Sequence, residues 1–454
     1  MMTIPQTVSA QREYFSTGAT LDLDFRRRML KALDASVDKW EDALYEALQT
    51  DLHKSREEAY MTEISIVKGE IKACLENLGK WASRKRRPTP LSCFPSRSYT
   101  VTEPLGNVLI VSPWNYPVQL ALNPLIGAIA AGCTAVLKLS PLAPSVSAVL
   151  SQMLSECFDM KYVAVFQGHR DVNEALFEER FDLIFLTGSP ALGKVVMSAA
   201  AKNLTPVILE LGGKSPCVID KGADLALAAR RAAWGKVLNA GQTCIAPDYI
   251  MVQRDLKDAF VGEFKSAVSA LLGAKPEESP YYGRIVSERA FHRLVSYLSE
   301  GTVLSGGHYD GDARFIEPTL LGDVSPDSAV MQDEIFGPVF PVIVYDKLDE
   351  VEAFVNSRPK PLALYYFGKE RKGWEFVRKT SSGGACINDT IMHIANPALP
   401  FGGVGNSGMG HYHGKESFLA FSHTRSVLCS PRRFDVPFRY MPYRLFGIVK
   451  KLLG

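Results

Sequence analysis

The sequence lacks the features that mark a membrane-spanning, secreted or nucleic-acid-binding protein. It contains no run of 18 or more apolar residues and no basic N-terminal segment followed by an apolar core. Its eight cysteines are scattered without CxxC or paired spacing, which is typical of reduced thiols inside a cell. The 51 Lys and Arg residues are nearly balanced by 49 Asp and Glu residues. We therefore expect a cytoplasmic protein without a nucleic-acid partner.

The sequence also has little that could hold a metal ion or build a hydrolase. His411 and His413 stand without a nearby cluster of Cys, Asp or Glu residues, so no metal site is expected. No motif ties a histidine to a cysteine, and no Gly-x-Ser-x-Gly elbow is present. Cysteine, carboxylate and amide side chains remain as candidates for the chemistry.

The patterning of apolar residues predicts an α/β protein with more than one domain. The length of 454 residues exceeds that of a usual single domain. Apolar residues recur at three- and four-residue spacing between about 23 and 82, which predicts helices. Short apolar runs then alternate with helical stretches, which is typical of a parallel sheet covered on both faces. The predicted strands are 108–111, 135–139, 162–166, 183–186, 207–211, 217–219, 250–252, 339–344, 362–367 and 385–388.

Polar and glycine residues fall at or just beyond the ends of these predicted strands. Such sheets bind ligands at the carboxyl ends of their strands. The residues concerned are Trp114, Asn115, Lys138, Gly188 and Glu210. This clustering is the strongest structural inference that the sequence offers.

Two of these positions favour a phosphate or ribose, although each has an ordinary structural alternative. The loop from Gly188 through Ser189 to Gly193 follows a strand and opens a helix, where free N–H groups bind anions. It matches neither the GxGxxG fingerprint nor a Walker A loop, and it fits common turn chemistry equally well. Lys138 interrupts an apolar strand, so its ammonium either reaches solvent or binds a hydroxyl or phosphate. The basic run 84–87 is expected to be a solvated turn, with phosphate binding as the alternative.

Three side chains are candidates for catalysis. Cys244 follows a run of small and polar residues and precedes Pro247, unlike the apolar contexts of Cys217 and Cys386. A nucleophilic thiol needs a partly exposed, electropositive or hydrogen-bonding site. Glu210 lies on a buried strand, where a carboxyl should have a raised pKa that suits a general base, unless it pairs with a cation. Asn115 lies in a Pro-flanked loop and could donate to a developing oxyanion.

Taken together, the motifs resemble the aldehyde dehydrogenase superfamily over residues 21–442. The stretches that carry the resemblance are Ser-Pro-Trp-Asn-Tyr-Pro at 112–117, Leu-Glu-Leu-Gly-Gly-Lys at 209–214, Gly-Gln-Thr-Cys-Ile-Ala-Pro at 241–247, Glu-Ile-Phe-Gly-Pro at 334–338 and Pro-Phe-Gly-Gly-Val-Gly-Asn-Ser-Gly at 400–408. The short N-terminus and the run Cys-Ile-Ala-Pro-Asp-Tyr are similar to the class 3 branch, which includes fatty and aromatic aldehyde dehydrogenases.

The resemblance implies a cysteine mechanism with a nicotinamide cofactor. It implies that Cys244 attacks an apolar aldehyde, that Asn115 stabilises the oxyanion of the thiohemiacetal, and that Glu210 activates the water that hydrolyses the thioester. Cofactor-binding roles are implied for Lys138, Gly188, Ser189, Gly193, Glu334, Phe336, Trp114 and Phe401. Substrate-lining roles are expected for Tyr116, Tyr60 and Met61. Transfer of the acyl group to coenzyme A, a thiol esterase and a non-catalytic binding protein remain as alternatives.

The family fold implies a Rossmann-like doubly wound cofactor domain, a second α/β catalytic domain and a small oligomerisation hairpin. We assign residues 1–82 and 105–210 to the cofactor domain, 211–410 to the catalytic domain, and 83–104 with 411–435 to the oligomerisation element. A homodimer is expected. The tail, 436–454, mixes aromatic, aliphatic and basic residues. We expect it to pack on the body or on a partner subunit, and a peripheral membrane contact is the alternative.

One departure from the family pattern concerns the cofactor. The family often has Pro-Ser-Glu after the lysine, and that glutamate contacts the adenosine ribose. Here the run is Lys138-Leu139-Ser140-Pro141, so the acidic residue is missing. Loss of a carboxylate removes repulsion against a 2′-phosphate, so we expect NADP to be accepted as well as NAD.

Overall fold

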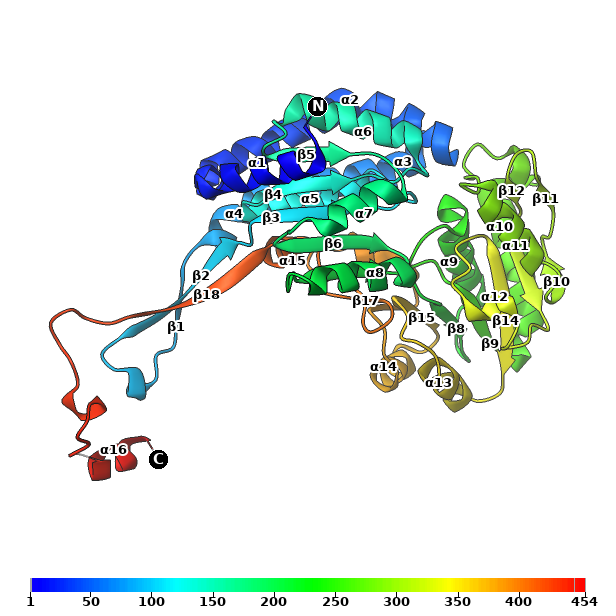
Figure 1. Cartoon of the computed structure of the whole chain (residues 1–454). Coiled ribbons are helices and arrows are strands. Elements are labelled where there is room, and N and C mark those ends of the chain that lie inside the picture. Colours follow the sequence, from blue (N-terminus) through cyan, green and yellow to red (C-terminus); the bar gives the residue numbers. More distant parts are fainter. Residues whose placement is uncertain (1, 445, 454) are drawn as a thin grey trace.

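A six-stranded sheet organises the first half of the chain (Figure 1). The computed structural model describes residues 2–444 and 446–453. The strand order is β17-β7-β6-β3-β4-β5, and only β17 runs antiparallel to its neighbour. The strands are β3 (Asn107–Val111), β4 (Thr134–Lys138), β5 (Val163–Phe166), β6 (Leu183–Gly188), β7 (Val207–Leu211) and β17 (Gly408–Met409). The predicted apolar runs of this half therefore form the expected parallel sheet.

Helices cover both faces of this sheet because its side chains alternate between two apolar layers. Val108 and Ile110 of β3 pack in the larger core, whereas Leu109 and Val111 pack in a second cluster. The larger core includes residues of α2 (Leu23–Leu52), α4 (Ser65–Ala82), α5 (Gln119–Ala131) and α6 (Pro144–Cys157). The second cluster includes residues of α1 (Ile4–Ser16), α7 (Arg170–Glu178) and α8 (Pro190–Ala201). The sequence patterning did not predict α1, because only three of its residues are buried.

A seven-stranded sheet organises the second half, in the order β10-β13-β14-β9-β8-β15-β16. Its strands are β8 (Pro216–Ile219), β9 (Tyr249–Gln253), β10 (Thr302–Ser305), β13 (Thr319–Gly322), β14 (Val339–Tyr345), β15 (Ala363–Phe367) and β16 (Gly384–Ile387). Its helices are α9 (Leu225–Val237), α10 (Lys257–Leu272), α11 (Glu288–Tyr297), α12 (Ala329–Gln332), α13 (Leu348–Asn356) and α14 (Glu370–Lys379). Two further strands, β11 (Tyr309–Asp310) and β12 (Phe315–Ile316), form a small separate hairpin. The five predicted strands of this half are present, while β10 and β13 were not predicted.

A three-stranded antiparallel sheet projects from the body as an arm (Figure 1). It contains β1 (Lys85–Arg87), β2 (Arg97–Pro104) and β18 (Ser422–Cys429), and α15 (Lys415–Ala420) leads into β18. The prediction of a solvated turn at 84–87 is wrong for three of these residues, because Lys85 to Arg87 pair with Thr100 to Ser98 of β2. Strand pairing satisfies the backbone while the basic side chains stay toward solvent.

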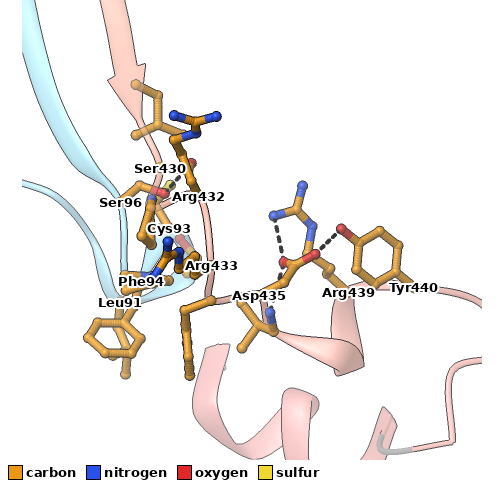
Figure 2. A pocket seen from close by; sticks show the side chains of 16 residues that line it. Leu91, Cys93, Phe94, Ser96, Ser430, Arg432, Arg433, Asp435, Arg439 and Tyr440 are labelled. Carbon is orange, nitrogen blue, oxygen red and sulfur yellow. Dashed lines mark hydrogen bonds and ion pairs between the residues drawn. The ribbon is translucent and has the colours of Figure 1, made fainter.

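The chain after β18 continues away from the body and ends in α16 (Phe446–Leu453) (Figure 1). Val436, Arg439 and Tyr440 of the tail line a groove together with the hairpin between β1 and β2, and not with the body (Figure 2). Packing of the tail on a partner subunit stays a prediction, and residues 445 and 454 of the tail lie outside the described residues. Among the described residues, no helix is both long and apolar enough to cross a membrane. The assigned boundaries between cofactor, catalytic and oligomerisation parts stay a prediction.

Candidate active site

A cavity of about 290 Å³ contains both the candidate nucleophile and the candidate base. Cys244 and Glu210 line it, together with Thr187 near the end of β6. Glu210 lies near the carboxyl end of β7, as expected for a ligand site of a parallel sheet. Most of the remaining lining is apolar, and it includes Met61, Ile66, Tyr116, Leu120, Trp234, Leu238, Ile391, Phe401 and Tyr412.

The loop that carries Cys244 is held in an unusual backbone conformation. Asn239 and Ala240 adopt left-handed φ angles of 50° and 52°, and Gly241 has a φ of 72°. A Cβ on Gly241 would lie 2.4 Å from the carbonyl oxygen of Gly337, so only glycine fits there. The buried Gln242 amide donates to the carbonyls of Asn239 and Arg284 at 3.1 and 3.0 Å. These bonds fix the position of the thiol that follows.

The Cys244 thiol is half-buried, and its surroundings are only partly those expected of a nucleophile. Burial raises the pKa of the thiol, and the carboxylates of Glu334 and Glu210 raise that pKa further. The backbone N–H groups of Cys244 and Ile245 favour the thiolate and lower the pKa by a smaller amount. Of the surroundings expected for a nucleophilic thiol, hydrogen-bond donors are therefore present, and the side chains that act on its pKa through charge are acidic.

Glu210 is a buried carboxyl without a protein partner. It is 3% exposed, and neither of its oxygens forms a hydrogen bond with any described residue. Burial raises its pKa well above the usual value for a glutamate. A structural buried glutamate usually pairs with a cation, but no ion pair among the described residues involves Glu210. An unpaired carboxyl in a cavity beside a thiol is suited to accept a proton from water.

Asn115 is fixed by a network that the sequence patterning did not reveal. Its side-chain nitrogen donates to the carbonyl of Gln242 at 3.1 Å, which leaves the second hydrogen of the amide for another acceptor. Its own carbonyl accepts from Asn239 at 2.8 Å and from the ammonium of Lys54 at 3.1 Å. The amide is thereby tied to the same loop that carries Cys244.

Lys54 and Glu63 form a buried ion pair beneath this network, with 2.6 Å between the Nζ and Oε1 atoms and no exposure of either side chain. Glu63 also accepts from the backbone N–H groups of Val118 and Gln119, at 2.8 and 3.1 Å, where α5 begins. The ammonium of Lys54 lies 3.9 Å from the ring centroid of Tyr116. The sequence predicted only helices with charged residues between the apolar positions over 23–82, and that pattern does not separate a buried ion pair from surface charges.

Glu58 is a further residue that supports the Cys244 loop and that the sequence analysis did not identify. Its Oε1 accepts from the backbone N–H of Asn239 at 2.8 Å, so it supports the left-handed turn before Cys244. Burial raises the pKa of Glu58 to about 7, although the charge of Lys54 opposes this. The helices at 23–82 therefore contribute the support of the site as well as one layer of the core.

The residues expected to hold the cofactor lie at neighbouring strand and helix ends. Lys138 ends β4, is 2% exposed, and donates from its Nζ to the carbonyl of Gly168 at 2.6 Å. Ser189 caps α8 by accepting from the N–H of Leu192 at 3.3 Å. At Gly193 a Cβ would lie only 3.0 Å from the side chain of Leu211, which explains the glycine by close packing, whereas a Cβ on Gly188 would make ordinary contacts.

Glu334 lies beside the glycine pair that follows Glu210. A Cβ on Gly212 would overlap the Glu334 carboxylate, at 1.8 Å from Oε2. Burial and the charge of Asp248 raise the pKa of Glu334 to about 8, while the N–H of Gly213 and the ammonium of Lys214 lower it. Lys214 pairs with Asp248.

These groups fit a dinucleotide. The ammonium of Lys138 and the carboxyl of Glu334 can bind hydroxyl groups, and the start of α8 presents N–H groups to a pyrophosphate. The rings of Trp114 and Phe336 pack edge to face, with 5.4 Å between their centroids.

The structure separates the expected residues into two groups. Cys244, Glu210, Tyr116, Met61 and Phe401 line the cavity. Trp114, Asn115, Lys138, Gly188, Ser189, Gly193, Glu334 and Phe336 are not part of that lining.

Tyr60 is the exception among the expected substrate contacts. It is 46% exposed and does not line the cavity, whereas its neighbour Met61 does. Both begin a π-helical turn at Tyr60–Ile64, in which successive side chains point in different directions. The substrate contact expected of Tyr60 therefore stays a prediction.

Known proteins resemble the chain over almost its full length. The model of the aldehyde dehydrogenase family matches residues 2–427. The chain is 45% identical to 4,4'-diaponeurosporen-aldehyde dehydrogenase of Staphylococcus aureus, covering 98% of this chain and 97% of that protein. It is 43% identical to the rat aldehyde dehydrogenase described as dimeric and NADP-preferring, covering 94% and 95%.

A solved structure of Staphylococcus aureus AldH in a substrate-bound state superposes with a TM-score of 0.98 at 45% identity, and all of both chains is covered. These similarities agree with the thiol, carboxyl and amide that the fold brings together. The chain therefore belongs to the aldehyde dehydrogenase family, in its class 3-like branch, and is an NAD(P)-dependent aldehyde dehydrogenase.

Proposed function

We propose that this enzyme oxidises an apolar aldehyde to its carboxylic acid through a thioester on Cys244. The observation that carries the proposal is a largely apolar cavity in whose lining a thiol and an unpartnered carboxyl occur together. The similarity to a dehydrogenase named for 4,4'-diaponeurosporen-aldehyde supports an apolar substrate.

The first step is attack of the Cys244 sulfur on the aldehyde carbon. The sulfur forms a bond to carbon, and the thiol proton passes to a base, so that a negative charge develops on the oxygen. The second amide hydrogen of Asn115 and the backbone N–H of Cys244 are the donors that suit this oxyanion. The bonds from Asn115 to Gln242 and from Asn239 and Lys54 to Asn115 keep the amide oriented before the substrate arrives.

A nicotinamide dinucleotide, when bound, supplies the acceptor for the hydride that leaves the carbon. Lys138 and Glu334 suit its ribose hydroxyls, and the N–H groups at the start of α8, with Ser189, suit its pyrophosphate. Phe401 lines the same cavity as Cys244 and suits the nicotinamide or the substrate.

Glu210 acts in the last step, hydrolysis of the thioester. Its carboxylate takes a proton from water, the water oxygen bonds to the acyl carbon, and the bond to sulfur breaks. The products are the acid and the free thiol, and one water is consumed for each aldehyde. The raised pKa of Glu210 suits this role, because a base of higher pKa takes up a proton from water more readily.

We further propose that NADP is accepted as well as NAD, and that the enzyme is a cytoplasmic homodimer. The missing carboxylate after Lys138 and the NADP-preferring name of the rat relative support the first. The projecting arm and the dimeric name of that relative support the second. The eight free cysteines support a reducing compartment.

The test follows absorbance at 340 nm with short, long-chain and aromatic aldehydes, supplying NAD or NADP separately. We expect reduced cofactor to appear fastest with apolar aldehydes and with both cofactors, and Cys244→Ala to abolish it. Turnover of aldehyde by Cys244→Ala at the wild-type rate would contradict the assignment of the nucleophile. Activity with NAD alone would contradict the expectation for NADP.

A further inference from the structure

Ile391, a residue of the cavity lining, lies at the centre of a strained backbone turn. Its φ and ψ angles are 61° and −40°, and the N–H of Met392 donates to the carbonyl of Thr390 at 2.5 Å across it. This is a γ-turn with a positive φ at its central residue, a type that is rare and strained. A β-branched side chain at such a φ is an outlier. We call residues 390–392 the Ile391 turn.

The strained turn places an apolar side chain in the wall of the cavity. Ile391 is 5% exposed, and three of the four residues in the short helix that follows, Met392–Ala395, line the same cavity. Glycine would adopt this backbone without strain, but it has no side chain to form a wall. The position of the isoleucine side chain therefore explains why a strained turn is kept here.

Arg231 of α9 holds the chain that enters the turn. Its guanidinium donates to the carbonyl of Asn388, and its Nε lies 3.6 Å from the carboxylate of Asp389. Its own carbonyl accepts from the hydroxyl of Thr390 at 2.8 Å. A Cβ on Gly235, one turn further along α9, would lie 2.9 Å from that hydroxyl, so the helix approaches the turn as closely as a glycine allows.

Tyr365 connects the turn to the loop that carries Cys244. This buried residue of β15 donates from its hydroxyl to the carbonyl of Ile245 at 2.5 Å. Burial raises the pKa of the hydroxyl, and the backbone N–H of Ile391, which points at its oxygen, lowers that pKa by a smaller amount. The Ile391 turn therefore lies beside the residue that follows the nucleophile, at the reacting end of the cavity.

We propose that the Ile391 turn selects the aldehyde by its width next to the carbonyl group. The Ile391 side chain narrows the reacting end of the cavity, so that a slender chain fits and a carbon with two methyl branches does not. Arg231 and Tyr365 are positioning residues, since neither lines the cavity and a strained turn persists only where its surroundings hold it. The inference rests on the proposed oxidation of apolar aldehydes and names a feature of the substrate which that proposal leaves open.

The test compares hexanal with an isomer that carries two methyl groups on the carbon next to the carbonyl. Both contain the same atoms, so a change between variants in the ratio of their kcat/KM values reports on shape. We expect the wild type to favour hexanal, and Ile391→Ala to lower the ratio about tenfold by better use of the branched isomer. Arg231→Met should lower the ratio as well, because the turn relaxes. Arg231→Lys should restore part of it, since an ammonium can still donate to the carbonyl of Asn388.

Arg230→Met is the matched control, because this neighbouring arginine of α9 is exposed and forms no ion pair among the described residues. It should keep the wild-type ratio. Arg231→Met combined with Ile391→Ala should give the ratio of Ile391→Ala alone, since Arg231 acts through that side chain. An equal loss of kcat/KM for both aldehydes in Arg231→Met, or additive effects in the double variant, would overturn the positioning role.

The same measurements separate the inference from the function on which it rests. A wild type that oxidises neither aldehyde would contradict the proposed apolar substrate, and the inference would fall with it. A wild type that oxidises hexanal, with the same ratio in Ile391→Ala, would overturn the inference alone. Thermal unfolding checks that each variant is folded, and the Arg231 variants test the turn even where Ile391→Ala is unstable.

Discussion

The cavity and the tip of the arm, which we define as residues 84–97 and 430–444, depart from ordinary protein structure in opposite ways. In the cavity, polar groups are buried without partners, as the two oxygens of Glu210 and the hydroxyls of Thr187 and Tyr412 show. In the tip, apolar groups such as Phe94 and Met441 are exposed without cover. Buried polar atoms normally find hydrogen bonds, and large apolar patches are normally covered. Each region is therefore complete only with something that the single chain does not supply.

The two regions also differ in how their side chains are held in place. The cavity is lined by residues of β6, β7 and the Cys244 loop, and buried hydrogen bonds hold that loop in place before reagents enter. The arm is a single three-stranded sheet whose strand β18 is mostly exposed, so in the single chain it gains little from its own packing. Five changes break or sharpen this comparison, from the largest expected effect to the smallest.

Replacing Cys244 by alanine should remove aldehyde oxidation by at least roughly 10⁴-fold, because no other thiol lines the cavity. Absorbance at 340 nm measures the loss, and thermal unfolding checks that the fold is kept. Cys386→Ala is the matched control, since that half-buried thiol lies 3.3 Å from His393 and outside the cavity lining. Equal losses in both variants would contradict the assignment.

Replacing Glu210 by glutamine should lower steady turnover by about 10²–10⁴-fold, because glutamine cannot take a proton from water. Rapid-mixing absorbance should still show one early release of reduced cofactor, since the thioester forms but does not hydrolyse. In the wild type, a carboxyl with a raised pKa is an active base only above that pKa, so turnover should rise with pH well above the usual range of a glutamate. A slow variant without the early release would point to the first step instead.

Replacing Asn115 by alanine should reduce turnover by about 10²–10³-fold through loss of an oxyanion donor. The effect should appear in the early release of reduced cofactor, which distinguishes it from the Glu210 variant. Asn115→Asp is a useful companion, because it keeps the shape and places a carboxylate where a donor is needed. Recovery of activity in Asn115→Asp would show that the amide acts only by its size.

Replacing Lys54 by methionine should destabilise the fold by about 3–5 kcal/mol, because it leaves the buried Glu63 carboxylate unpaired. Denaturant unfolding gives the free energy of unfolding. Adding Glu63→Gln removes the unpaired charge while keeping the acceptor for the N–H groups of Val118 and Gln119, so the double variant should recover part of the loss. No loss in the single variant would mean that the ion pair does not support the site.

The smallest effect is expected in the arm. Phe94→Ala should change the free energy of unfolding by less than about 0.5 kcal/mol, because the side chain is 58% exposed. Phe185→Ala, at a fully buried ring that packs on Tyr412 and Phe421, should cost about 3–5 kcal/mol. A similar loss of unfolding free energy in both variants would contradict the contrast between arm and core, since it would mean that Phe94 is buried in the folded assembly.

By itself the sequence determined the sheet of the first half and the identity of the reacting groups. Strands that are apolar throughout, such as 108–111 and 183–186, are expected to be buried on both faces, and their alternation with helices predicts a parallel sheet. Glu210 on such a strand and Cys244 in its polar setting were recognisable because the motifs around them are local. The absence of an acidic residue after Lys138 was also recognisable, because it concerns the residues directly next to a local motif.

Only the tertiary structure decided what surrounds these groups. Lys54 lies in the loop between α2 and α3, and Glu63 follows nine residues later in the π-helical turn Tyr60–Ile64. Nothing local shows that both point inward to meet Asn115 and the start of α5. The acidic environment of Cys244 comes from Glu334, which is 90 residues away in the sequence. The strand at Lys85–Arg87 likewise depends on pairing with β2, which in turn pairs with β18 more than 300 residues later in the sequence. The burial of a side chain and the charge around it depend on all the residues that folding brings close to it. A pattern along the chain does not show which residues those are.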